Sequence, residues 1–133
     1  MTTPRFLSLS QVEFLHAVSL ERFGGLAGTR ESGLVASALA SAENSLWYGK
    51  GDLFDVAAAY AFHLAEAQAF LDGNKRVGAA AALVFLDLNG FSTPDSADRS
   101  IYLALIAAAE RSLDKPGLAA LLRSLAPPLP SSP

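Results

Sequence analysis

The segment with the clearest chemical potential is Phe70-Leu71-Asp72-Gly73-Asn74-Lys75-Arg76, where a tight turn leads directly into an apolar helix. Backbone N–H groups in the first turn of a helix have no helical partners, and the helix dipole makes that end electropositive. Lys75 and Arg76 add two cationic donors at the same place. The segment therefore predicts an anion site suited to phosphate.

Each residue of this segment also has a purely structural interpretation. Gly73 lets a ligand approach the backbone closely, or serves only as a turn residue. Asn74 is able to hydrogen-bond a phosphate or to cap the turn. Asp72 is able to hold a magnesium ion that bridges phosphates, or to act only as a helix cap. Lys75 and Arg76 are equally compatible with solvated surface charges. The spacing excludes a Walker loop, which needs G-x-x-x-x-G-K-[ST].

The composition excludes several classes of protein. A length of 133 residues suits one domain, which we expect over residues 1–126, followed by a disordered Pro/Ser-rich tail over 127–133. The absence of cysteine excludes cysteine zinc sites, thiol nucleophiles and redox motifs. A net charge of -3 gives no general electrostatic reason to bind nucleic acid directly.

No signal or membrane segment is evident in the sequence. The amino terminus lacks the long apolar core of a signal peptide. The longest apolar stretch, Val77–Leu86, is far shorter than the ~20 residues that a bilayer-spanning helix needs. We therefore expect a cytoplasmic protein without a membrane partner.

Helical periodicity runs through the chain, and no segment shows the alternation of a strand. We expect an all-α fold, a compact bundle of about six helices, over about residues 10–23, 31–43, 53–70, 74–89, 93–111 and 114–125. Ser10 and Glu13 are expected to form a capping box at the first helix, with Leu9 and Phe14 as its hydrophobic staple. Gly78 and the four alanines after it predict a central position for the fourth helix.

Together these motifs resemble the Doc branch of the Fic/Doc family, whose signature is H-x-F-x-D-G-N-K-R. The likeness extends over about Ser8 to Gly90. It includes Gly24–Gly28 with Arg30–Leu34, the helix start Asp52-Leu53-Phe54, and Ala80–Leu86 with Asn89-Gly90.

The resemblance implies a compact Fic/Doc-like helical fold and the toxin of a toxin–antitoxin module. Doc-type proteins are kinases that transfer the γ-phosphoryl of ATP, with Mg²⁺, to a threonine of elongation factor Tu and so block translation. By resemblance, Asp72 helps to hold the metal, Gly73, Asn74, Lys75 and Arg76 bind the phosphates, and Phe70 anchors the loop in the core.

The resemblance also separates two kinds of chemistry within the family. Fic proteins that transfer AMP carry glycine at the place of Lys75 and arginine at the place of Ala79, so the pattern here is the Doc pattern.

The resemblance implies a protein partner as well. This partner is a Phd-type antitoxin, which we expect to dock as an amphipathic helix. The expected groove lies among the carboxy-terminal helices, which carry residues that are apolar enough to belong to the core, namely Leu118, Leu121, Leu122 and Leu125.

The chain departs from the signature at its first position, where Gln68 stands in place of histidine. In the family this histidine takes the proton from the attacking hydroxyl, whereas a neutral carboxamide has no usable basicity near pH 7. Losing a general base typically lowers a rate by a factor of ~10² to ~10⁴. We therefore expect this chain to be catalytically impaired, through either an introduced inactivating change or natural degeneration. A non-catalytic binding module and a nucleotidyl transferase remain as alternatives.

Neither histidine of the chain is expected to replace the missing base. His63 lies five residues before Gln68 on the same expected helix, and five helical steps leave the two side chains about 140° apart. His16 has no catalytic companion nearby in the sequence and is expected to be a structural residue. Glu66 would place a negative charge near the phosphate site unless it points away.

Overall fold

The computed structural model describes residues 3–47 and 51–125, and these ranges are all-α. Six helices follow one another: α1 (Leu9–Phe23), α2 (Ser32–Trp47), α3 (Leu53–Ala67), α4 (Asn74–Leu88), α5 (Ala97–Ala109) and α6 (Lys115–Leu125). The expected bundle of six helices is thus confirmed, while the tail 127–133 lies outside the described residues. No helix in the described ranges has the length and apolarity needed to cross a bilayer.

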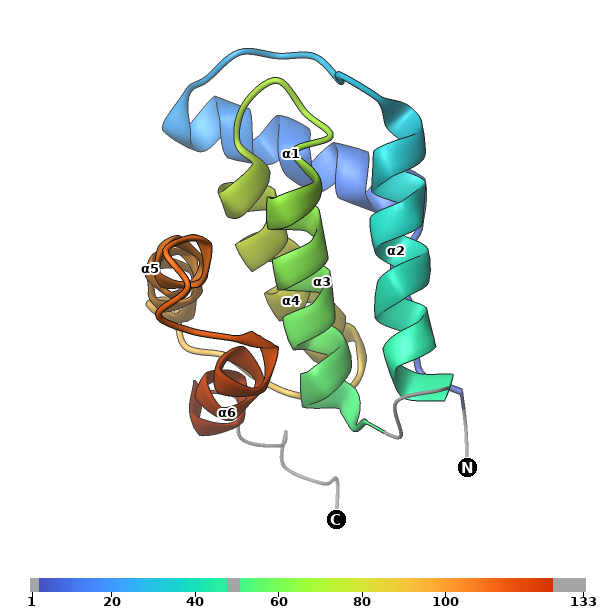
Figure 1. Cartoon of the computed structure of the whole chain (residues 1–133), viewed down its shortest axis with the longest axis vertical. Coiled ribbons are helices and arrows are strands. Elements are labelled where there is room, and N and C mark those ends of the chain that lie inside the picture. Colours follow the sequence, from blue (N-terminus) through green and yellow to red (C-terminus); the bar gives the residue numbers. More distant parts are fainter. Residues whose placement is uncertain (1–2, 48–50, 126–133) are drawn as a thin grey trace.

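Helices α3 and α4 pack against each other in the middle of the bundle (Figure 1). Helix α2 runs alongside α3, and α5 and α6 lie on the opposite side. Helix α1 crosses one end of the α3–α4 pair. The α1–α2 loop and the α3–α4 loop meet at this end, so the predicted anion segment lies beside a loop that is remote in the sequence.

The close approach of α3 and α4 depends on the small residues of α4. A Cβ atom added to Gly78 would lie 2.7 Å from the carbonyl oxygen of Ala61 on α3, closer than van der Waals contact permits. Ala79, Ala81 and Ala82 are completely buried in the same region. The central position predicted for this helix is confirmed.

Helix α1 begins earlier than predicted, because its N-cap is Ser8. The Ser8 hydroxyl accepts a hydrogen bond from the Gln11 backbone N–H at 3.2 Å, and the Gln11 side chain accepts one from the Ser8 N–H at 2.8 Å. The prediction of a capping box between Ser10 and Glu13 is therefore wrong, since these two residues lie inside the helix.

The predicted hydrophobic staple is wrong for the same reason. Starting the helix at Ser8 places Leu7 and Val12 at the staple positions, and both are buried in the core. The side chains that we expected there face solvent instead, since Leu9 is 39% and Phe14 67% exposed.

Three other helices also differ from the prediction at their ends. Helix α2 continues to Trp47 rather than residue 43, because Leu46 packs against the core and no helix-breaking residue comes before Gly49. Helix α5 covers only Ala97–Ala109. Helix α3 ends at Ala67 rather than at residue 70, because the residues that follow it pair with the α1–α2 loop.

Helix α6 turns its apolar face inward. Leu118 and Leu122 are completely buried in the core, and Leu121 and Leu125 pack against it. At its polar face, Arg123 forms ion pairs of 2.9 Å with Asp52 and 3.3 Å with Asp55 at the start of α3. The core position predicted for these leucines is therefore confirmed, and within the described residues they are not open as a docking groove.

Candidate functional site

The predicted signature segment begins where the chain leaves α3. Gln68 is the C-cap of this helix and adopts the left-handed conformation, with φ 50° and ψ 43°. Glycine adopts this conformation readily, whereas other residues rarely do. Of these other residues, asparagine, aspartate and histidine adopt it most often. The position occupied by Gln68 thus has a backbone that suits histidine better than glutamine.

The helix ends here because the next residues pair with the α1–α2 loop. The Arg30 N–H donates to the Ala69 carbonyl at 2.7 Å, and the Leu71 N–H donates to the Gly28 carbonyl at 3.0 Å. An isolated antiparallel bridge joins Thr29 to Phe70. These backbone bonds replace the last helical turn that the apolar pattern predicted.

Phe70 lies beneath the loop, only 3% exposed, and its ring stacks on the imidazole of His16 with centroids 3.8 Å apart. His16 Nε2 is 2.7 Å from the carbonyl oxygen of Asp72. Since a carbonyl only accepts, Nε2 carries the proton and donates. His16, on α1, therefore supports the loop from behind, a contact that no local sequence pattern revealed.

Asn74 closes the turn with its side chain. Its Oδ1 accepts from the Phe70 N–H at 3.1 Å, and its Nδ2 donates to the Phe70 carbonyl at 3.1 Å. The side chain thus makes the structural contact that the sequence allowed, and one Nδ2 hydrogen remains for a further acceptor.

Asp72 connects the two loops. Its Oδ1 accepts from the Gly73 N–H at 2.9 Å, and its Oδ2 accepts from the Leu26 N–H at 3.2 Å. A Cβ atom at Gly25, where φ is 122°, would lie 2.8 Å from Asp72 Oδ2, so glycine is required there. The carboxylate is exposed and keeps lone pairs for a further ligand.

A single carboxylate fits magnesium, which usually takes one or two protein carboxylates together with phosphate oxygens and water. Within residues 3–47 and 51–125 no group of three histidine, aspartate or glutamate side chains is placed to hold a metal. The donor set around Asp72 therefore suits a magnesium ion carried by a phosphate ligand and not a metal held by protein alone.

Helix α4 starts at this loop with unpaired donors. Gly73 is its N-cap, in the left-handed conformation with φ 79°, and contributes no side-chain cap. The first helical bond runs from the Val77 N–H to the Gly73 carbonyl at 2.9 Å. Within the described residues, the N–H groups of Asn74, Lys75 and Arg76 have no hydrogen-bond acceptor.

The three residues that carry these N–H groups line a cavity of about 440 Å³. Lys75, Arg76, Gln68 and Asp72 contribute to its lining, together with residues from three other parts of the chain: Phe23 on α1, Gly24 and Gly25 in the next loop, and Tyr102 on α5. A second cavity of about 390 Å³ shares Ala65, Gln68 and Lys75 with the first. Gln68 and Lys75 thus stand at the junction of the two cavities.

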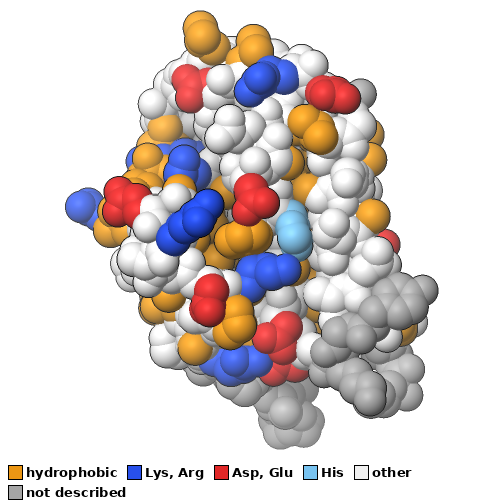
Figure 2. All heavy atoms as spheres, viewed as in Figure 1, with side chains coloured by type: hydrophobic (Ala, Val, Ile, Leu, Met, Phe, Trp, Pro, Cys, Tyr) orange, Lys and Arg blue, Asp and Glu red, His pale blue; other side chains and the backbone are white. Residues whose placement is uncertain are grey.

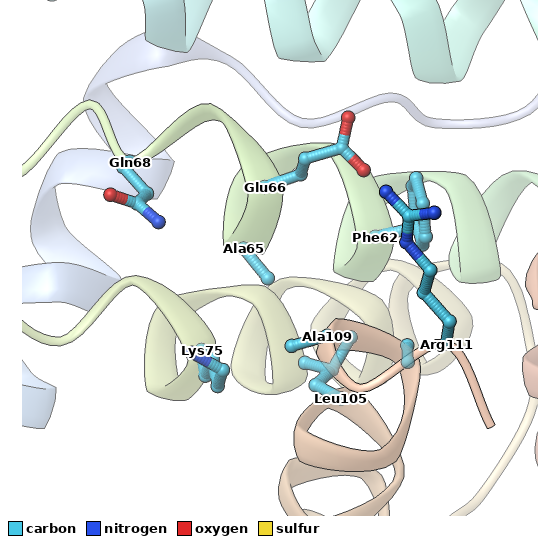
Figure 3. Close-up of a pocket in the computed structure, with 9 residues that line it drawn as sticks. Phe62, Ala65, Glu66, Gln68, Lys75, Leu105, Ala109 and Arg111 are labelled. Carbon is cyan, nitrogen blue, oxygen red and sulfur yellow. The ribbon is translucent and has the colours of Figure 1, made fainter. Parts of the chain in front are cut away.

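The second cavity has an apolar wall and charged ends (Figure 3). The wall comes from Phe62 on α3 and from Leu105, Ala108 and Ala109 on α5. Glu66 points toward Arg111 and away from Lys75, while Gln68 points toward the start of α4. The negative charge of Glu66, which the sequence allowed to lie near the phosphate site, is therefore directed away from the predicted phosphate position.

His63 lies elsewhere. Its Nε2 accepts from the Lys115 ammonium at 3.3 Å, and it lines neither of the two cavities. Burial, together with the Lys115 charge, lowers the pKa of His63, although Glu66 acts in the opposite direction. This histidine is not placed to serve as a base beside Gln68.

Charged groups are mixed across the face of the molecule shown in Figure 2, where lysine and arginine alternate with aspartate and glutamate. This face shows no continuous basic area of the kind that binds a nucleic acid backbone. The chemistry of the site therefore rests on a local concentration of positive charge and N–H groups at the start of α4.

Comparison with known proteins agrees with this geometry. The profile of the Fic/DOC family matches residues 6–86, which include α1 to α4 up to Leu86 and the whole signature segment. "Protein kinase doc" from Escherichia phage P1 is 33% identical over 101 residues, covering 73% of this chain and 80% of that protein. With its six helices, the signature segment between α3 and α4 and this match over most of its length, the chain belongs to the Fic/DOC family.

Proposed function

We propose that the chain is a Doc-type toxin of a toxin–antitoxin module, built for transfer of the γ-phosphoryl of ATP to a threonine of elongation factor Tu. One observation carries this proposal: Asn74, Lys75 and Arg76, whose N–H groups are unpaired, all line the same 440 Å³ cavity. Phosphoryl transfer depends mainly on positioning and charge neutralisation, which such a site supplies. The similarity to a protein kinase supports the same choice.

Each residue of the site has a role in this proposal. Lys75 and Arg76, with the N–H groups of α4, bind the phosphates and neutralise the charge that develops on them. Asp72 would hold a magnesium ion, which supplies further charge neutralisation when bound. Asn74 and Phe70 keep the loop in shape.

Gln68 stands where the acceptor hydroxyl would lose its proton. Its carboxamide points toward the start of α4 and is able to hold a hydroxyl by hydrogen bonds, but it cannot take the proton. The proposed activity of the chain as it stands is therefore lower by a factor of ~10² to ~10⁴ than that of a histidine-bearing site. An action on elongation factor Tu places the protein in the cytoplasm, where an antitoxin of the Phd type would restrain it.

The test compares Gln68→His with Gln68→Asn, since both residues tolerate the left-handed conformation and only histidine is a base. Each protein is incubated with elongation factor Tu, magnesium and ATP labelled at the γ-phosphate. We expect Gln68→His to transfer label at least ~10²-fold faster than Gln68→Asn. Equal rates from two folded variants would overturn the kinase proposal.

A non-catalytic binding module is the second candidate, and the position of Gln68 favours it. No histidine in the described residues lines either of the two cavities, so no imidazole there takes the place of the motif histidine. In this case the chain would bind nucleotide without turnover, and Lys75→Ala would weaken binding measured by calorimetry. A Gln68→His variant that binds ATP yet remains inert would favour this candidate over the kinase.

AMP transfer is a third candidate with less support. Ala79, at the place of the second arginine of AMP-transferring Fic proteins, is completely buried on α4 and supplies no cation to the cavity. ATP labelled at the α-phosphate distinguishes this reaction, because only AMP transfer would leave that label on the acceptor protein.

A further inference from the structure

Arg76 is held between two aromatic rings that come from distant parts of the chain. Its guanidinium carbon lies 4.0 Å from the ring centroid of Phe23, the last residue of α1, and 3.7 Å from that of Tyr102 on α5. A guanidinium stacks well on aromatic faces, and such contacts strengthen where water is excluded. Arg76 itself is half-buried.

The sandwich leaves the hydrogen-bonding capacity of Arg76 unused. Within the described part of the chain, no carboxylate lies within 4.0 Å of its guanidinium, and no acceptor bonds to it. Arg123 behaves differently, since it pairs with both Asp52 and Asp55. With both ring centroids within 4.0 Å of the guanidinium carbon, the N–H donors of Arg76 remain available to a ligand.

The same three residues line the 440 Å³ cavity, so Arg76 borders the proposed phosphate position. Arg76 also lines a further cavity together with Asp95 and Asp98, but neither carboxylate pairs with it. Bidentate binding of an oxyanion requires a guanidinium whose plane is fixed in the correct direction. An arginine free to rotate would lose this advantage.

We infer that Phe23 and Tyr102 are positioning residues, an aromatic clamp that fixes the plane of Arg76 so that its edge faces a phosphate in the cavity. The inference rests on the proposed function, since that function supplies the phosphate. The clamp explains why Phe23, 46% exposed, stands at the rim of a polar cavity. It also links α1 and α5 to the start of α4, so that three helices determine the orientation of one cation.

The test uses inorganic tripolyphosphate as the probe and calorimetry at fixed salt as the measurement. Tyr102→Leu and Phe23→Leu remove a stacking face, and we expect each to weaken binding by about 2- to 30-fold, the range of a cation–π contact. Tyr102→Phe keeps the face and should restore the affinity of the starting protein. Leu103→Ala, at a half-exposed neighbour on α5, serves as the matched control.

A double-mutant cycle separates positioning from general damage to the fold. Lysine keeps the charge at this place but loses the planar fork, so the effect of Tyr102→Leu should disappear in the Arg76→Lys background. An equal loss in both backgrounds would overturn the clamp, as would Tyr102→Leu binding as tightly as Tyr102→Phe. If the starting protein fails to bind tripolyphosphate, this result overturns the proposed phosphate site and therefore also the clamp.

Discussion

His16 donates a hydrogen bond from Nε2 to the carbonyl oxygen of Asp72, at 2.7 Å, across 56 positions of the sequence. The contact joins the interior of α1 to the turn that precedes α4. Because the same imidazole stacks on Phe70, one side chain contacts two of the signature residues. The shape of the anion loop therefore depends on a helix that contributes no cation to the proposed phosphate contacts.

Replacing His16 by phenylalanine keeps a ring against Phe70 and removes the donor. We expect His16→Phe to lower the free energy of unfolding by ~1 kcal/mol, the usual net contribution of such a bond. Amide exchange of Gly73 and Leu26, which both donate to Asp72, should become faster. Phe14→Leu is the control, since Phe14 is 67% exposed on the same helix and its change should stay within ~0.5 kcal/mol. Unchanged exchange at both amides would show that His16 does not support the loop.

Most of the fold was predictable because helical periodicity and Gly/Pro signals are local. Helix α4 shows this best, since its apolar spacing and its small residues predicted both its extent and its central position. The errors arose where long-range contacts decided between local alternatives. The N-terminus of α1 follows the burial of Leu7, and the end of α3 follows backbone pairing with the α1–α2 loop.

Only the part of the candidate site that lies in one continuous stretch of the sequence was predictable. Lys75, Arg76 and the donors of α4 lie within one segment, so the sequence was enough to bring them together. His16, Phe23 and Tyr102 reach the same place from α1 and α5, and no periodicity or motif marks them as parts of a site. Their roles depend on how the helices pack.

Gln68 provides a prediction about backbone strain. Its left-handed conformation carries a penalty that glycine avoids and that a β-branched residue increases. We expect Gln68→Gly to leave the protein as stable or up to ~1 kcal/mol more stable, and Gln68→Val to destabilise it by more than ~1 kcal/mol. Urea unfolding of the three proteins tests the order. A valine variant as stable as the glycine variant would mean that residue 68 is free to leave this conformation.

The crossing of α3 and α4 provides a prediction about packing. In Gly78→Ala the new methyl group would meet the Ala61 carbonyl at 2.7 Å, and this oxygen belongs to the backbone of a buried helix and cannot easily move. We expect a loss of ~1 to ~3 kcal/mol in the free energy of unfolding. Gly33→Ala on α2 is the matched control, because a Cβ there meets nothing within 4 Å and alanine favours the helix. Similar effects of the two substitutions would contradict the close crossing.

The ion pairs between α6 and α3 provide a prediction about pH. Partial burial acts to raise the pKa of Asp52, but the hydrogen bonds from the Asp55 backbone and from Arg123 outweigh it, so the pKa is lowered from its ordinary value of 3.8. A carboxyl group with a lowered pKa in the folded state contributes stability above its unfolded pKa and loses it as the pH falls through the folded value.

Arg123→Met should therefore be less stable than the starting protein at pH 7, with the difference shrinking as the pH falls below about 4. Because these side chains are about half exposed, the difference should also shrink in high salt. The measurement is the urea midpoint of both proteins at pH 7 and pH 3, each at low and high salt. Arg99→Met, at an exposed cation of α5 that pairs with neither aspartate, is the control and should show no such dependence on pH. A stability difference for Arg123→Met that is the same at both pH values would mean that Arg123 acts through packing on Phe54 and not through its charge.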